Sequence, residues 1–83
     1  MRLRYFAWIR LRTGVGEETW TPHPPVDSLG ALMARLRARG GGYARAFASP
    51  DGIRVAVNGA CAGPDTVLRP EDEVIFFPPV TGG

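Results

Sequence analysis

The sequence has 83 residues, 45% of them hydrophobic, and a formal net charge of +2. This length allows one compact domain with a modest core and leaves little room for a deep catalytic pocket, since such pockets usually form between domains or at the rims of large sheets. The single cysteine, Cys61, excludes an intramolecular disulfide and a thiolate metal cage. A carrier or binding role with no metal is therefore favoured.

No segment has the features of a membrane span or a secretion signal. No apolar run approaches the roughly 20 residues needed to cross a bilayer, and no charged segment precedes a long apolar one at the start of the chain. The ten basic residues are all arginines, and they are dispersed from Arg2 to Arg69 as solvated positions would be. We therefore expect a cytoplasmic protein that binds neither membrane nor nucleic acid.

Alternating apolar residues predict a first strand over residues 3–9. One face of this strand would carry two aromatic residues, Phe6 and Trp8, among arginines, and the other would carry Leu3, Tyr5, Ala7 and Ile9. Residues 13–16 read as a turn and residues 17–21 as a short second strand, which completes a hairpin.

Helical spacing follows the prolines that end the second strand. Asp27 or Ser28 is a suitable N-cap, and the apolar positions of one helix face are Val26, Leu29, Leu32, Met33 and Leu36. The triple glycine at 40–42 predicts the end of this helix. Residues 43–48 favour a further short helical turn.

The second half of the chain predicts strands with one strong turn signal. A strand over residues 53–57 is followed by the tight turn Asn58-Gly59 and a weak continuation over residues 60–62. A last strand over residues 73–77 ends at Pro78 and Pro79, which cannot donate to a ladder. This order predicts an α+β fold, with a mixed sheet around one main helix, as a single domain over residues 1–77.

Residues 78–83 are predicted to form a flexible tail that projects from the domain by about 20 Å when extended. The prolines stiffen its base, while Gly82 and Gly83 lack side chains and can thread a narrow channel in another protein. For Gly-Gly alone, a frayed terminus is the plainer interpretation. The surrounding sequence decides between the two.

The ending Phe-Phe-Pro-Pro-Val-Thr-Gly-Gly, preceded by residues 72–75, resembles the C-terminal signature of the small subunit of molybdopterin synthase. The resemblance extends over nearly the whole chain. It includes Tyr5-Phe6-Ala7, Arg10, Gly14, the helix near residues 29–36 and Val55-Ala56-Val57-Asn58. It implies a ubiquitin-like β-grasp fold, in agreement with the predicted order of elements.

The resemblance also implies a function. In that family the terminal glycine, here Gly83, is adenylated by a ubiquitin-activating-type enzyme that uses ATP, and is then converted to a thiocarboxylate. The large subunit of the synthase uses this sulfur to convert cyclic pyranopterin monophosphate to molybdopterin, in a heterotetramer. The chain would thus be the sulfurtransferase subunit of an enzyme, with no complete active site and no bound cofactor of its own.

Partner-contact positions are carried over in the same way. They fall on Phe6, Cys61 and Phe77, with Arg10 at the rim and with the tail residues Pro78, Pro79, Val80 and Thr81. An exposed apolar docking patch is expected from the first three, because such surface usually marks an interface. Cys61 is interpreted as an apolar contact and not as the sulfur-carrying group, because no His or Lys neighbours it in sequence. The lone His23 is interpreted as a surface residue.

Two other functions remain open from the sequence. One is a related sulfur carrier for thiamine thiazole synthesis. The other is a non-catalytic β-grasp interaction module that binds a protein or RNA and undergoes no chemistry at its terminus.

Overall fold

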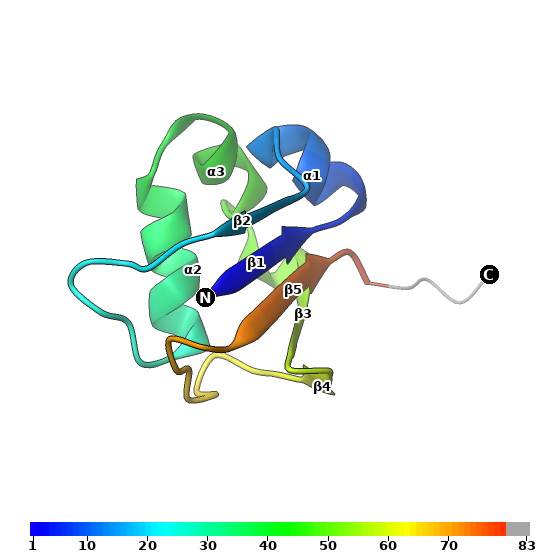
Figure 1. Ribbon diagram of the computed structural model, residues 1–83. Coiled ribbons are helices and arrows are strands. Elements are labelled where there is room, and N and C mark those ends of the chain that lie inside the picture. The colour runs from blue at the N-terminus through cyan, green and yellow to red at the C-terminus, as the bar shows by residue number, and fades with distance from the viewer. Residues whose placement is uncertain (80–83) are drawn as a thin grey trace.

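The structure is a computed structural model that describes residues 1–79. Its five-stranded sheet has the order β2-β1-β5-β3-β4 (Figure 1). The central pair β1 and β5 is parallel, and every other neighbouring pair is antiparallel. The strands are β1 (Arg2–Tyr5), β2 (Glu17–Thr19), β3 (Arg54–Val57), β4 (Ala60–Cys61) and β5 (Glu73–Phe77).

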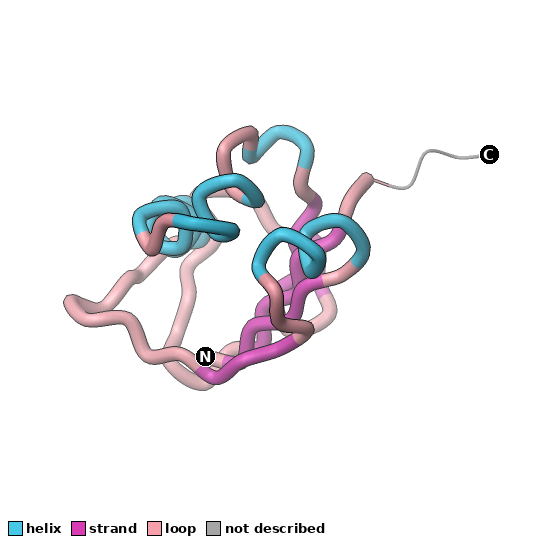
Figure 2. Tube along the Cα trace, turned by 90° about the horizontal axis from the view of Figure 1, so that it is seen from above, coloured by secondary structure: helices cyan, strands magenta, loops and turns pink. Residues whose placement is uncertain are grey.

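Helices form a second layer on one face of this sheet. They are α1 (Ala7–Thr13), α2 (Leu29–Ala38) and α3 (Gly41–Ala46), with a short 3-10 turn η1 (Pro50–Gly52) before β3. The α2 helix is the longest, and α1 and α3 lie side by side (Figure 1). Figure 2 shows the same helices and strands from above. This confirms the predicted α+β arrangement of a mixed sheet around one main helix.

The core lies between α2 and the inward face of the sheet. Alternate strand residues such as Leu3, Val55 and Phe76 are buried there, and Leu32 and Leu36 of α2 meet them. Tyr5 stacks on Phe76 with 5.6 Å between ring centroids, and Phe47 meets Phe76 edge-on at 5.0 Å. Burial of these apolar side chains is the main term that stabilises the fold.

The predicted strand over residues 3–9 is wrong in its second half. The strand ends at Tyr5, and after extended Phe6 the chain turns through Ala7 (φ 52°) into α1. Ile9 is buried as expected, but from a helix, while Ala7 is exposed. Gly14 ends α1 in the left-handed region (φ 81°), with its N–H donating to the carbonyl of Arg10.

The α2 helix agrees with its predicted signals at the N-terminus. Ser28, and not Asp27, is the N-cap, and its hydroxyl accepts a hydrogen bond from the N–H of Ala31 at 3.2 Å. At the C-terminal end of α2, only the first glycine of the triple glycine at 40–42 ends the helix as predicted. Gly40 (φ 79°) breaks the helix, whereas Gly41 and Gly42 are already the first residues of α3.

The turn between β3 and β4 is the predicted tight turn. Asn58 (φ 51°) and Gly59 (φ 84°) are both left-handed, as a type I′ hairpin requires. The Asn58 side chain donates to the buried carboxylate of Asp72 at 2.9 Å and accepts from the N–H of Glu73 at 3.0 Å. Asp72 therefore fixes the turn before β5, and its hydrogen bonds lower the pKa of its carboxyl.

A cluster of polar side chains, which was not predicted from the sequence, joins β2 to β1, to α3 and to the C-terminal end of α2. Glu18 accepts hydrogen bonds from Tyr5 (2.8 Å), Tyr43 (2.6 Å) and Arg39 (3.0 Å). Burial alone would raise the pKa of Glu18, but these hydrogen bonds outweigh it and lower the pKa. Burial and the bond to Glu18 raise the pKa of Tyr43 to about 12, so both tyrosines stay protonated donors.

Replacement of Glu18 is expected to destabilise the chain in a pH-dependent way. Glu18→Gln should lower the free energy of unfolding by about 2 kcal/mol at pH 7. This is less than the sum expected for three charged hydrogen bonds, because solvent screens a partly exposed group. Because the folded-state pKa of Glu18 is lowered, its contribution is complete above the ordinary value of 4.5 and is lost as the pH falls through the folded pKa.

The measurement is urea denaturation of both chains at pH 7 and at acid pH. The difference in free energy of unfolding should shrink as the pH falls below the ordinary value of 4.5 and through the lowered folded-state pKa of Glu18. Glu17→Gln, at the exposed neighbouring position, is the matched control and should have little effect. An equal difference at both pH values would contradict the proposed role of the charge.

Candidate docking face and C-terminal strand

The face of the sheet that points away from α2 carries a row of side chains across four strands. The pairing register aligns Arg4 with Ile75, Ile75 with Ala56, and Ala56 with Cys61. Residues paired in this way point to the same side of a sheet. Leu3, Val55 and Val74 alternate with them toward the core, so this row lies on the solvent side.

A second row lies beside the first at the end of β5. Phe77 pairs with Arg54, and Phe6 continues the β1 pairing because its N–H donates to the carbonyl of Phe76 at 3.1 Å. Phe6 is 42% exposed and Phe77 is half-buried. We call the five residues of the two rows that are not arginines the sheet-face patch: Phe6, Ala56, Cys61, Ile75 and Phe77.

Arginines border the sheet-face patch. The Arg4 guanidinium lies 5.3 Å from the centroid of the Phe6 ring, within cation–π range. Arg54 is exposed beside Phe77, and Arg10 of α1 lines a shallow depression with Arg4 and Phe6. An apolar centre with a cationic rim is the composition expected of a surface that binds another protein.

The structure thus brings Phe6, Cys61 and Phe77 onto one face, with Arg10 near its edge, as their predicted common role requires. Trp8 does not join them. Because α1 replaces the predicted strand, Trp8 packs against the core and under the guanidinium of Arg12, which lies 4.7 Å from its ring. The sequence analysis missed Ile75 at the centre of the patch, although its place two residues before Phe77 on the same strand is a usable signal.

The chain leaves the sheet from its middle strand. β5 lies between β1 and β3 and ends at Phe77, directly beside Phe6 and Arg54. Pro78 is half-buried and Pro79 is exposed. Val80, Thr81, Gly82 and Gly83 lie outside the described residues, as does most of the predicted tail.

Other candidate groups contribute no further site within residues 1–79. Cys61 is a free, exposed thiol, and His23 is exposed in the loop before α2. No group of three or more His, Cys, Asp and Glu side chains in this part of the chain could hold a metal ion. Among the same residues no helix has the length and apolar character of a membrane span.

A mixed sheet with a central parallel pair, packed on one main helix and with the last strand in the middle, defines a ubiquitin-like β-grasp protein. The chain belongs to the ThiS family, whose model matches residues 3–83. It is 36% identical over 85 residues to the molybdopterin synthase sulfur carrier subunit of Escherichia coli (strain K12), an alignment that covers 100% of this chain and 99% of that protein. The crystal structure of SAMP1 from Haloferax volcanii matches it with a TM-score of 0.66 and 26% identity, over 100% of this chain and 98% of the other.

Proposed function

We propose that this chain is the sulfur carrier subunit of a molybdopterin synthase, and that its sulfur is carried as a thiocarboxylate on Gly83. The observation that carries the proposal is the full-length identity of 36% to a protein with that name. The same relative favours this function over a sulfur carrier for thiamine thiazole synthesis. The described geometry supports it, since a partner bound to the sheet-face patch would contact the strand from which the C-terminal segment continues.

The proposed chemistry takes place on the carboxylate of Gly83. A carboxylate is inert toward nucleophiles because its oxygen is a poor leaving group. Attack of this oxygen on the α-phosphorus of ATP releases pyrophosphate and forms an acyl adenylate. A sulfide-level nucleophile then attacks the acyl carbon and AMP leaves, so one oxygen is exchanged for sulfur without a change of oxidation state.

Two partners follow from this proposal, and this chain needs no bound cofactor. A ubiquitin-activating-type enzyme would bind ATP and adenylate Gly83, with Gly82 permitting close approach in a narrow channel. The large synthase subunit would then accept Pro78, Pro79, Val80 and Thr81 along the same channel and use the sulfur to convert cyclic pyranopterin monophosphate to molybdopterin. We propose a cytoplasmic heterotetramer, in which this chain supplies the reactive group and the large subunit supplies the active site.

Intact-mass spectrometry tests the function directly. The chain is incubated with its activating enzyme, ATP and a sulfur donor, and a gain of about 16 Da on the C-terminal peptide is expected, the difference between sulfur and oxygen. Deletion of Gly83 should abolish this gain. No gain with an active enzyme would favour the non-catalytic interaction module, whereas a loaded chain that supports only thiazole formation would favour the thiamine alternative.

The sheet-face patch gives a separate prediction about the large subunit. Ile75→Asp is expected to weaken binding by about 30-fold, or about 2 kcal/mol, because it places a charge at the apolar centre of the patch. Isothermal titration calorimetry with the purified large subunit measures this. Val67→Asp makes the same kind of change at a position that is 67% exposed and away from the patch, and should leave binding unchanged. Equal affinities for the two variants would remove the patch from the interface.

A further inference from the structure

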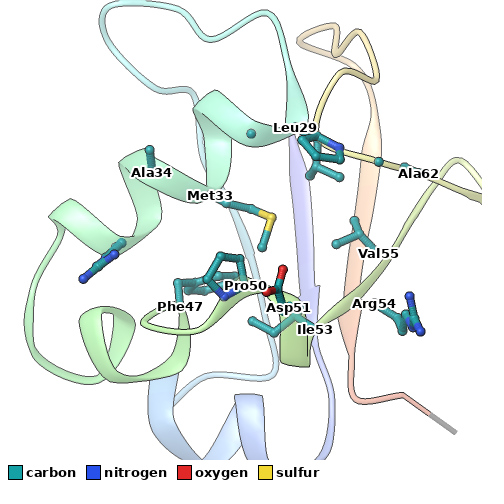
Figure 3. A pocket seen from close by; sticks show the side chains of 14 residues that line it. Leu29, Met33, Ala34, Phe47, Pro50, Asp51, Ile53, Arg54, Val55 and Ala62 are labelled. Atoms are coloured by element: carbon teal, nitrogen blue, oxygen red, sulfur yellow. The ribbon is translucent and has the colours of Figure 1, made fainter.

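A groove on the other side of the sheet lies outside the docking face. It runs between α2 and β3 and encloses about 570 Å³ (Figure 3). Met33 of α2 extends into it toward Ile53 and Val55. Pro50 and Pro64 are also among its lining residues. Volumes of a few hundred Å³ with an apolar lining are typical of sites that bind ligands. Because Val55 points toward α2 and Ala56 to the other side, the groove is distinct from the sheet-face patch.

An open edge of the sheet borders this groove. β4 ends at Cys61, and the last hydrogen bond along this edge of β3 runs from the N–H of Ala62 to the carbonyl of Val55 at 3.0 Å. The chain then crosses to α2, where the carbonyl of Pro64 accepts from the N–H of Gly30 at 2.9 Å. Segment 62–64 therefore does not continue as a strand beside the first half of β3.

Backbone groups are consequently left available at this edge. The Asn58 N–H donates to the carbonyl of Glu73 on β5, so by the alternation of an antiparallel ladder the N–H of Val55 and the carbonyl of Ile53 face the opposite edge. Outside the strand ladders, no backbone hydrogen bond formed within residues 1–79 involves either group. An edge of this kind is a template for pairing with another extended segment.

The charges at the rim are mainly positive. Arg37 lines the groove from α2, and Arg54 lines its β3 edge, where its side chain projects to the same side of the sheet as Ala56. Asp51 is the one carboxylate among the described residues that line it. Both arginines are exposed, and the ion pairs formed among residues 1–79 involve neither of them. The rim therefore complements a ligand that carries acidic groups next to an apolar one.

We propose that this groove binds a short extended segment of a partner protein, in which apolar side chains alternate with acidic ones. The segment would add to the edge of β3 by pairing with the N–H of Val55 and the carbonyl of Ile53. Its apolar side chains would face α2 and fill the space beside Met33. Its alternate acidic side chains would face the other side of the sheet, where Arg54 lies, and a carboxylate at the end of the segment would pair with Arg37. In strand addition, backbone hydrogen bonds give affinity and alternate side chains give specificity. Here the edge of β3 would supply the backbone hydrogen bonds, and the groove and the arginines would select the side chains.

The test uses a synthetic hexapeptide that alternates valine and glutamate, titrated into the full ¹⁵N-labelled chain and followed by NMR. Saturable shifts are expected at the amides of Met33, Val55 and Ala62, and hydrogen exchange of the Val55 N–H should slow because it gains an acceptor. Arg37→Glu should weaken binding about fivefold to tenfold. Arg69→Glu makes the same reversal at an exposed position outside the groove and should leave binding unchanged.

Two further peptides separate the components of the proposal. N-methylation of the peptide backbone should abolish binding, since it removes the ladder donors, and replacement of glutamate by lysine should weaken it strongly. The proposal is overturned if the valine–glutamate peptide shows no saturable binding up to about 5 mM. It is equally overturned if the shifts map to the sheet-face patch, or if the methylated or lysine peptides bind as well as the first. The outcome is independent of sulfur loading, because none of the described residues that line the groove belongs to the C-terminal segment.

Discussion

Extension of the chain by one alanine after Gly83 is expected to slow sulfur loading by at least about a hundredfold. The activated carboxylate would then belong to the added residue, displaced by up to about 3.6 Å along an extended chain. A misplacement of about 1 Å in a reacting group can cost about a hundredfold in rate. The added residue also brings a Cβ into a channel that two glycines are proposed to thread. The measurement is the rate of the mass gain with the activating enzyme, ATP and a sulfur donor.

The control for this prediction is the affinity of the same extended chain for the large subunit. The sheet-face patch is unchanged by the extension, so binding should be retained to within about tenfold while loading is lost. A non-catalytic interaction module would behave differently, because added C-terminal residues would leave its activity intact. Normal cofactor synthesis by the extended chain would therefore refute the thiocarboxylate mechanism and favour the interaction module.

Local signals in the sequence predicted the structure correctly where the backbone conformation or a free backbone group requires a particular type of residue. Ser28 caps α2, Asn58-Gly59 forms the left-handed turn, and residues 73–77 form β5 with the bounds that the two following prolines predict. Each of these depends on contacts within a few residues in the chain. The central helix and the last strand, which determine the fold class, were therefore predictable from the sequence.

The first strand shows where local signals fail. Ile9 is compatible with a period of two from Leu3 and equally with the buried face of a short helix, so the pattern does not distinguish them. The structure forms the helix because Gly14 ends it in a left-handed turn and α3 packs against it. The first of these signals was present in the sequence, but the packing of α3 is a contact between distant residues.

The candidate site was predictable only in part for the same reason. Resemblance to a family identified Phe6, Cys61 and Phe77, whose grouping requires the registers of β1, β3, β4 and β5. Ile75 joins them through those registers alone. The open edge beside Val55 depends on the early end of β4, and the Glu18 cluster depends on contacts of three elements. None of these has a signature at short range.

Gly42→Ala is expected to lower the free energy of unfolding by about 3 kcal/mol, although Gly42 lies outside the core. A Cβ built at Gly42 would overlap the carbonyl oxygen of Arg12 and lie 2.8 Å from its carbonyl carbon. Both obstacles are backbone atoms of α1, so no change of rotamer relieves the overlap, and α3 would have to move away from α1. This movement would loosen the packing of Ile9 against the core. The melting temperature should fall by about 12 to 24 °C in a chain of this size.

The sign of this effect separates packing from helix propensity. Alanine is a better helix former than glycine by about 1 kcal/mol, so propensity alone predicts that Gly42→Ala stabilises α3. Gly52→Ala is the matched control, because a Cβ there meets nothing within 4 Å, and it should change the free energy of unfolding by less than about 0.5 kcal/mol. Thermal and urea unfolding of the two variants distinguish the effect of packing from that of helix propensity. A neutral or stabilising Gly42→Ala would mean that α1 and α3 do not pack at backbone contact, and α1 would then owe its position to Ile9 and the Gly14 turn alone.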